Sequence, residues 1–128
     1  MIAAFDPGGQ VIRDAVRRAV EEAGLRVVQY RDAIRPGAEL TSIILDGIRR
    51  ADLIIADVSR ENPNVLYEIG FAHALRKPTI LLFDTKSNER LPSDLAGLEF
   101  ITYDAANPGA LADRVKSEAK AFAMRRSA

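Results

Sequence analysis

The chain has 128 residues, of which 48% are hydrophobic and 28% are charged, a composition that predicts one globular domain spanning residues 1–128. Eighteen basic residues balance eighteen acidic residues, so no net charge would draw the chain to nucleic acid or to an anionic membrane. The chain has no cysteine and a single histidine, His73, which excludes disulfides, thiolate nucleophiles and a metal site built from several histidines. No metal site is expected.

Apolar runs in the chain are short. The N-terminal sequence carries no basic leader, and runs such as "TILLF" have the length of a strand. We therefore expect neither a signal peptide nor a membrane span, and a cytoplasmic location.

These apolar runs alternate with segments of helical period. The runs predict five strands, at residues 2–5, 25–30, 52–58, 79–84 and 98–104. The other segments predict four helices, at 11–23, at 40–50, from Pro63 until Pro78 stops the helix, and at 108–124. This alternation predicts an α/β fold, a flavodoxin-like three-layer sandwich whose five-stranded parallel sheet has the order 2-1-3-4-5.

Ligands of such sheets bind beyond the carboxyl ends of the strands, where the strand order reverses. The first segment at that edge is the glycine-rich turn after the first strand. Its Asp6, Gly8 and Gly9 could present backbone N–H groups to a phosphate, although the G-x-G-x-x-G and P-loop patterns are absent. Phe5 could stack on a base or pack in the core.

The second segment at this edge is "ADVSRENPN", which leads into the third helix. Asp57 ends the strand and could contact a ribose hydroxyl or bond the next loop. Asn62 is a good N-cap before Pro63, which suits the first helical position. Asn64 could supply its amide to a ligand.

Glu68 is the residue of this helix that burial does not explain. It shares a helix face with Val65, Ala72 and Leu75, so it should lie at the edge of the core. Desolvation there would raise the pKa of the carboxyl group, and the nearby helix N-terminus would lower it. Because a glutamate in the early turns also stabilises the helix dipole, the residues alone leave a functional and a structural role open.

Two other residues of this helix have expected roles. His73 lies five residues beyond Glu68, about 140° around the helix, so a direct partnership is not expected. Gly70 costs up to about 1 kcal/mol relative to alanine inside a helix, which suggests the close approach of another backbone or of a ligand.

The stretch "ADLIIADVSRENPNVLYEIGFAHALRKPTILL" resembles the core of the nucleoside 2-deoxyribosyltransferase-like proteins and of the related TIR (Toll/interleukin-1 receptor) domains. In both groups a strand, a polar loop and a helix carrying the glutamate precede "KP" and the next buried strand. The RD and PG elements of a TIR box are matched upstream by Arg31, Asp32, Pro36 and Gly37. "LPSDLAGLEFITYD" is similar to the last strand region of prokaryotic TIR-like proteins, so the resemblance covers residues 25–104.

The resemblance implies an enzyme that cleaves the N-glycosidic bond of a nucleotide, most simply NAD. Glu68 matches the catalytic glutamate, which would stabilise an oxocarbenium-like state of the ribose or form a covalent intermediate. Asn62 matches a position that binds phosphate or sugar in the deoxyribosyltransferases. The nucleotide is then the substrate and no cofactor is needed. TIR-like enzymes often act only when assembled, so the resemblance also implies a homo-oligomer formed through the PG loop.

One departure from the deoxyribosyltransferases bears on the substrate. Those enzymes carry an aspartate that orients the base, seven residues ahead of an alanine that matches Ala51. This chain has Ile44 at that position. Asp46, two residues later, lies about 200° around the helix from Ile44. Nicotinamide can leave NAD without a general acid, whereas a purine or pyrimidine benefits from one, so Ile44 favours NAD. Two alternatives stay open: a nucleoside or nucleotide deoxyribosyltransferase or hydrolase, and a non-catalytic TIR-type nucleotide-sensing or self-association module.

Overall fold

The computed structural model describes residues 2–6, 9–28, 40–59, 63–87 and 100–127. Within these residues the strands are β1 (Ile2–Asp6), β2 (Arg26–Val28), β3 (Leu53–Asp57), β4 (Thr79–Asp84) and β5 (Phe100–Tyr103). The helices are α1 (Gln10–Glu22), α2 (Leu40–Arg50), α3 (Pro63–Ala74) and α4 (Pro108–Ser127). The strands pair in parallel, in the order β2-β1-β3-β4-β5.

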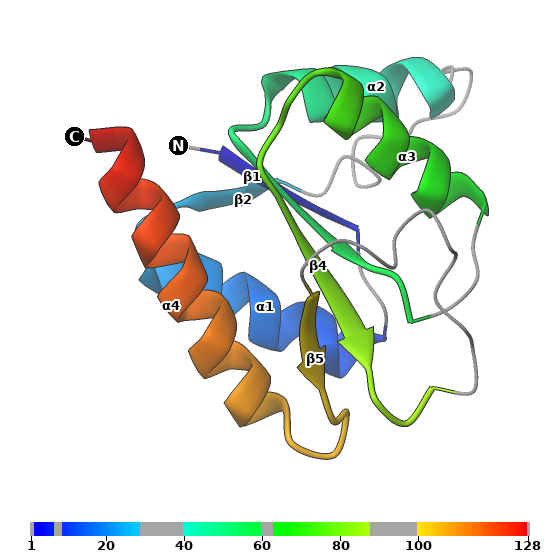
Figure 1. Cartoon of the computed structure of the whole chain (residues 1–128). Helices are drawn as coiled ribbons and strands as arrows, with labels where there is room; N and C mark the ends of the chain where they lie inside the picture. The colour runs from blue at the N-terminus through cyan, green and yellow to red at the C-terminus, as the bar shows by residue number, and fades with distance from the viewer. Residues whose placement is uncertain (1, 7–8, 29–39, 60–62, 88–99, 128) are drawn as a thin grey trace.

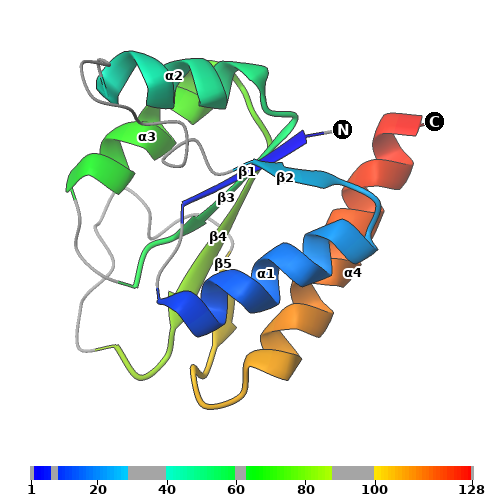
Figure 2. The ribbon, with the colours of Figure 1, turned by 180° about the vertical axis from the view of Figure 1, so that it is seen from behind.

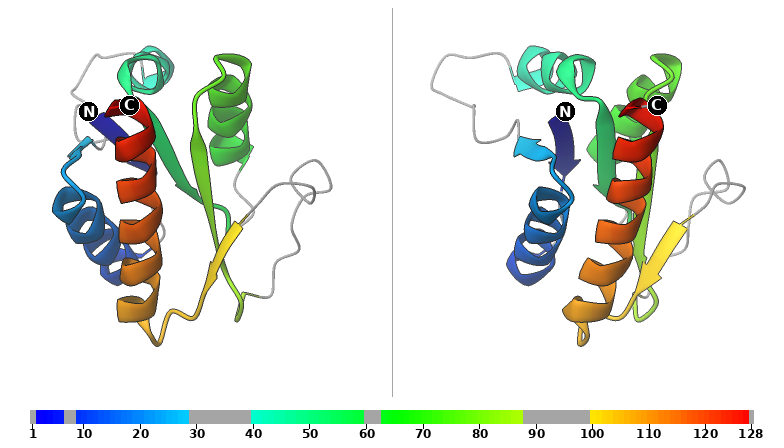
Figure 3. Two further views of the ribbon diagram at one scale, coloured as in Figure 1. Left: turned by 60° about the vertical axis from the view of Figure 1, so that its left-hand side comes forward. Right: turned by 90° about the vertical axis from the view of Figure 1, so that its left-hand side faces the viewer.

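The sheet lies between two layers of helices. Helices α1 and α4 pack against each other on one face, and α2 and α3 cover the other (Figures 1 and 2). The views in Figure 3 show the two layers on opposite sides of the strands. The predicted α/β class and parallel sheet are confirmed. None of the described helices is long and apolar enough to cross a membrane.

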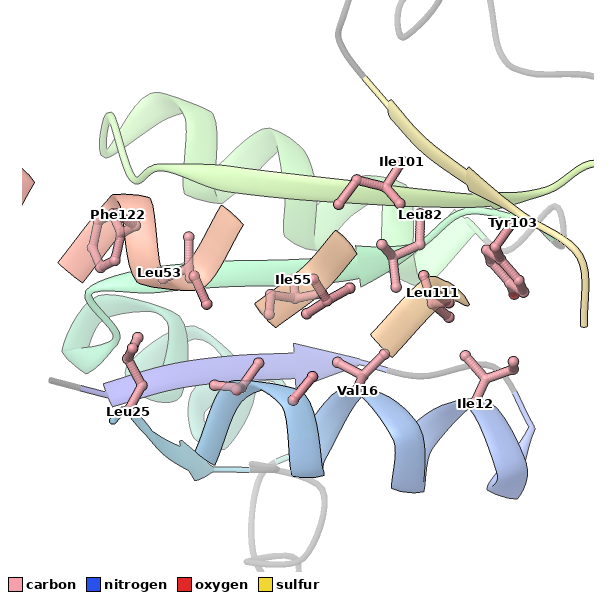
Figure 4. Close-up of a cluster of buried hydrophobic side chains, with 14 residues drawn as sticks. Ile12, Val16, Leu25, Leu53, Ile55, Leu82, Ile101, Tyr103, Leu111 and Phe122 are labelled. Atoms are coloured by element: carbon pink, nitrogen blue, oxygen red, sulfur yellow. The ribbon is translucent and has the colours of Figure 1, made fainter. Parts of the chain in front are cut away.

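The two faces of the sheet carry cores of unequal size. Alternate residues of the strands, such as Leu53, Ile55 and Leu82, join α1 and α4 in a cluster of 14 buried residues (Figure 4). On the opposite face, Ile54 packs with α2 and Ala72, while Ala56 packs with Val65 and Ile69 of α3. The face that carries α3 is thus held by two smaller clusters.

Helices α1 and α3 end in the same way. Gly24 follows α1 in a left-handed conformation (φ +92°), and Leu25 N donates to Val20 O at 3.2 Å. Arg76 has the equivalent place after α3 (φ 56°), and Lys77 N donates to Ala72 O at 2.9 Å. Both are Schellman-type caps, so α3 ends at its own cap, ahead of Pro78.

Lys77 also joins α3 to the end of α2. Its Nζ donates to Arg49 O at 2.9 Å and to Ala51 O at 2.8 Å. A cation at this point pairs with the last carbonyl groups of a helix, which have no partner within the helix itself. The "KP" pair therefore has a structural explanation that requires no ligand.

Several predicted boundaries shift. Helix α4 runs to Ser127 and not to Met124, because Arg126 Nη2 binds Asp52 Oδ1 at 3.0 Å and holds its last turn. Asp52, which was predicted to be the first residue of the third strand, lies outside β3. Parts of the predicted second and fifth strands and the PG loop lie outside the described residues.

Candidate functional site

The order of the sheet reverses between β1 and β3. The chain leaves β1 into α1 on one face and leaves β3 toward α3 on the other. Both helices therefore begin at the carboxyl edge of the sheet, next to the point where open α/β sheets bind ligands. The strands themselves are adjacent, with Asp6 opposite Ala56.

Glu68 is buried in the second turn of α3, with 5% of its surface exposed. Val65, Ile69 and Ala72 share the buried side of the helix, and at about 100° per residue Glu68 lies at the edge of their arc. Ala72 packs on α2, whereas Val65 and Ile69 pack on β3 and β4. The Glu68 side chain is thus on the side of α3 that faces α2, as the sequence predicted for a carboxylate at the edge of the core.

The facing part of α2 is apolar. Ile44 and Ile48 are buried there, in the same cluster as Ala72. Asp46 points elsewhere, because its Oδ2 pairs with Arg50 Nη2 at 3.0 Å and 49% of its side chain is exposed. Asp46 therefore does not replace the aspartate that the deoxyribosyltransferases carry at the position of Ile44.

Asp57 lies on the opposite face of the sheet from Glu68. In β3 it alternates with Leu53 and Ile55, whose side chains join the α1 and α4 core. Its Oδ1 accepts from Ser59 N at 2.9 Å and its Oδ2 from Tyr103 Oη at 2.5 Å. Burial, followed by the bond to Asp57, raises the pKa of Tyr103 well above its usual value, so the phenol stays protonated. The structure does not bring Asp57 and Glu68 together.

The remaining predicted residues are only partly described. Gly9 is the exposed N-cap of α1, and its carbonyl oxygen accepts from Arg13 N at 3.0 Å. Phe5 and Asp6 lie in β1 and Asn64 in α3, but their side chains are outside the described set. Gly8 and Asn62 lie outside it entirely.

Arg13, in the first turns of α1, was not predicted from the sequence. Its Nε is buried and has no hydrogen-bond partner within the described part of the chain. Long side chains of a helix lean toward its N-terminus, which for α1 is the carboxyl edge of the sheet. An arginine on a helix that carries both acidic and basic residues gives no sequence signal that its Nε will be buried.

Among the described residues, no three histidine, aspartate or glutamate side chains are grouped so that they could hold a metal ion.

Among the described residues, no other backbone approaches Gly70, contrary to the expectation. Gly70 is exposed, and a Cβ atom added there would meet no described atom within 4 Å outside its own part of α3. It lies about 160° around α3 from Glu68, so the two residues point in different directions. His73 is exposed and lies about 140° around α3 from Glu68.

Replacing Gly70 should therefore stabilise the domain. We expect Gly70→Ala to raise the free energy of unfolding by about 0.5–1 kcal/mol, because alanine loses less backbone entropy in a helix. Thermal unfolding measures the change. A loss of stability would show that another part of the chain or a neighbouring copy approaches Gly70 closely.

Comparison with known proteins agrees with this arrangement. Residues 8–105 match the family described as CAP12/Pycsar effector protein, TIR domain. A search against proteins of curated function gives no match.

Similar solved structures include three α/β proteins of low identity. CMP N-glycosidase BcmB from Clostridium botulinum is 21% identical, with a TM-score of 0.69 over 90% of this chain and 98% of that one. The TIR domain of the Toll-related receptor TRR-2 from Hydra magnipapillata is 14% identical, with a TM-score of 0.69 over 93% and 97%. A 2-deoxyribosyltransferase from Bacillus psychrosaccharolyticus is 14% identical, with a TM-score of 0.64 over 91% and 90%.

These likenesses define the class as a TIR-like α/β domain whose fold is shared with N-glycosidases and deoxyribosyltransferases. The chain belongs to the CAP12/Pycsar effector TIR-domain family.

Proposed function

We propose that this domain cleaves the N-glycosidic bond of NAD, with Glu68 as the catalytic carboxylate. The observation that carries the proposal is the burial of Glu68 on the side of α3 that faces α2, where every described neighbour on its arc is apolar. Buried carboxylates are costly to a fold and are concentrated at functional sites. The family and the fold of the similar N-glycosidase and deoxyribosyltransferase are consistent with this chemistry.

In the proposed reaction the bond between C1′ of the ribose and the nicotinamide nitrogen breaks. Both bonding electrons leave with the nitrogen, which neutralises the pyridinium charge and releases nicotinamide. The Glu68 carboxylate stabilises the positive charge on the sugar or bonds to C1′. Water then adds to C1′ and loses a proton, which yields ADP-ribose.

The choice of NAD depends on the leaving group. Because nicotinamide departs as a neutral molecule, the site needs no acid to protonate it. Ile44 is buried on the facing helix, and Asp46 is turned away in its pair with Arg50. A site without an acid at this position suits nicotinamide, which needs no proton to leave, better than a purine or pyrimidine, which benefits from one.

We further propose that the phosphates of the nucleotide lie at the first turn of α1. Gly9 caps this helix without a side-chain hydrogen bond, which leaves N–H groups for an anion. Arg13 adds a buried Nε that has no acceptor among the described residues. Since β1 and β3 are neighbours about 4.8 Å apart, a dinucleotide can reach both α1 and α3.

Arg13→Met should weaken substrate binding and leave the chemical step intact. We expect the KM for NAD to rise about tenfold with little change in kcat, because a charge-assisted hydrogen bond contributes about 1.5–3 kcal/mol. Steady-state kinetics measure both constants. Arg17→Met, one turn further from the N-terminus, is the matched control, and an equal effect of the two substitutions would contradict the assignment.

The function is tested by incubating the purified chain with NAD, CMP, deoxynucleoside monophosphates and nucleosides, and by identifying products by mass spectrometry. Release of nicotinamide with linear or cyclic ADP-ribose is the expected result. Release of cytosine or another base would instead support a deoxyribosyltransferase or a nucleoside or nucleotide hydrolase, and would contradict the proposed cleavage of NAD. Because we also propose that the active form is a homo-oligomer, the assay should cover a range of protein concentrations. Binding without turnover at every concentration would indicate a nucleotide-sensing module.

A further inference from the structure

We propose that Tyr103 and Ser59 are positioning residues, which fix the exit of β3 and thereby the helix that carries Glu68. This inference rests on the proposed function of Glu68. It reassigns Asp57 from a sugar ligand to the anchor of a hydrogen-bonded network. The network lies at the carboxyl ends of β3, β4 and β5, where Figure 4 shows Tyr103 near the end of β5.

The hydrogen-bond directions in this network can be assigned without ambiguity. Tyr103 Oη donates to Asp57 Oδ2, so its oxygen can only accept from Ser59 Oγ, which lies 3.3 Å away. Ser59 Oγ accepts in turn from Asp84 N at 2.8 Å. The series therefore runs from the Asp84 amide through the serine and the phenol to the Asp57 carboxylate. Each donor has an acceptor, which makes such a buried series rigid.

This network leaves Asp57 poorly suited to bind a ligand. Both carboxylate oxygens already accept hydrogen bonds, and only 8% of the residue is exposed. Its side chain also faces the α1 and α4 core, on the other face of the sheet from Glu68. Its contribution to the site must therefore pass through the chain that follows it.

The described part of that chain, at Ser59, is held by two hydrogen bonds of its backbone. Ser59 N donates to Asp57, and Ser59 O accepts from Ser87 Oγ at 2.6 Å. Only residues 60–62 separate Ser59 from Pro63, the first residue of α3. Ser59 therefore lies close in sequence to the start of α3.

The same segment also packs against α3. Val58, one residue before Ser59, is buried with Val65 and Ile69, the neighbours of Glu68 on the buried arc. Loss of the Tyr103 hydroxyl would free the Ser59 hydroxyl and one Asp57 oxygen without removing the aromatic ring from the core. Because catalysis depends on the placement of the reacting carboxylate to well under 1 Å, the effect should fall on kcat.

Tyr103→Phe tests the inference. We expect kcat for NAD to fall about tenfold with KM changed less than about twofold. Phe122→Leu, which loosens the same core at the far end of α4, should leave kcat unchanged at a similar loss of thermal stability. Ser59→Ala should lower kcat as Tyr103→Phe does, and the double variant should be no worse than either one, since both break one network.

A measurement without substrate separates this inference from the proposed function. Hydrogen exchange should be faster in the α3 amides of residues 65–68 in Tyr103→Phe, by about tenfold, and unchanged in residues 44–48 of α2. Unchanged exchange in α3, or a loss of kcat equal to that of Phe122→Leu, would overturn the positioning role. If the wild type cleaves no nucleotide, the proposed function fails, and hydrogen exchange alone decides whether the network positions α3.

Discussion

Glu68→Gln should abolish turnover and leave the fold intact. We expect kcat to fall at least about 10³-fold, equivalent to roughly 4 kcal/mol of transition-state stabilisation, because a neutral amide can neither balance the charge on the ribose nor bond to C1′. Glutamine has the size of glutamate and removes a charge from a position only 5% exposed. The melting temperature should therefore stay within a few degrees of the wild type.

The control for this substitution is Glu118→Gln, an exposed carboxylate on α4. It should change neither kcat nor stability. Glu68→Asp keeps the charge and withdraws the carboxylate by one methylene, so it should lose most of the activity if the position of the oxygens matters. Turnover of Glu68→Gln within tenfold of wild type would remove Glu68 from the mechanism.

Ile55→Ala should cause the largest loss of stability. Ile55 lies in the middle of β3 and is fully buried in the cluster with α1 and α4. We expect the free energy of unfolding to fall by about 2–5 kcal/mol, because the methyl groups are lost and the rigid strand cannot close the cavity. Urea unfolding measures this, and the melting temperature should drop by about 10 °C or more.

Two matched variants calibrate this value. Ile55→Val removes one methylene and should cost about 0.5–1.5 kcal/mol. Val11→Ala, at a position 63% exposed, should stay within about 0.5 kcal/mol of wild type. A cost for Ile55→Ala close to that of Val11→Ala would mean that the sheet is not packed between α1 and α4 as described.

Local signals in the sequence account for much of the fold. Helix α2 and strand β4 have the bounds predicted for them, because the spacing of Ile44 and Ile48 is helical and an apolar run after Pro78 is long enough for one strand. Gly24 was recognisable as a helix end because glycine readily adopts positive φ. Arg76 takes the same conformation without any such residue-type signal, so the true end of α3 could not be predicted.

Some features of the site could likewise be predicted from local sequence, and others could not. The burial of Glu68 follows from its neighbours at i−3 and i+4, which are local in sequence. The partner of Asp57 is 46 residues away, and whether its carboxylate meets Tyr103 or a ligand depends on the order of the strands and on which residues of each strand share a face. The Nε of Arg13, which has no hydrogen-bond partner in the described part of the chain, likewise depends on tertiary packing, and no local sequence pattern predicts it.

The unequal cores have a consequence for how this domain can change in evolution. The large cluster beneath α1 and α4 fixes the sheet, whereas α2 and α3 rest on two smaller clusters on the other face. Substitutions that reshape the surroundings of Glu68 therefore leave the larger cluster on the opposite face untouched. A lineage can exchange one ligand preference for another on that face while the opposite face keeps the protein folded.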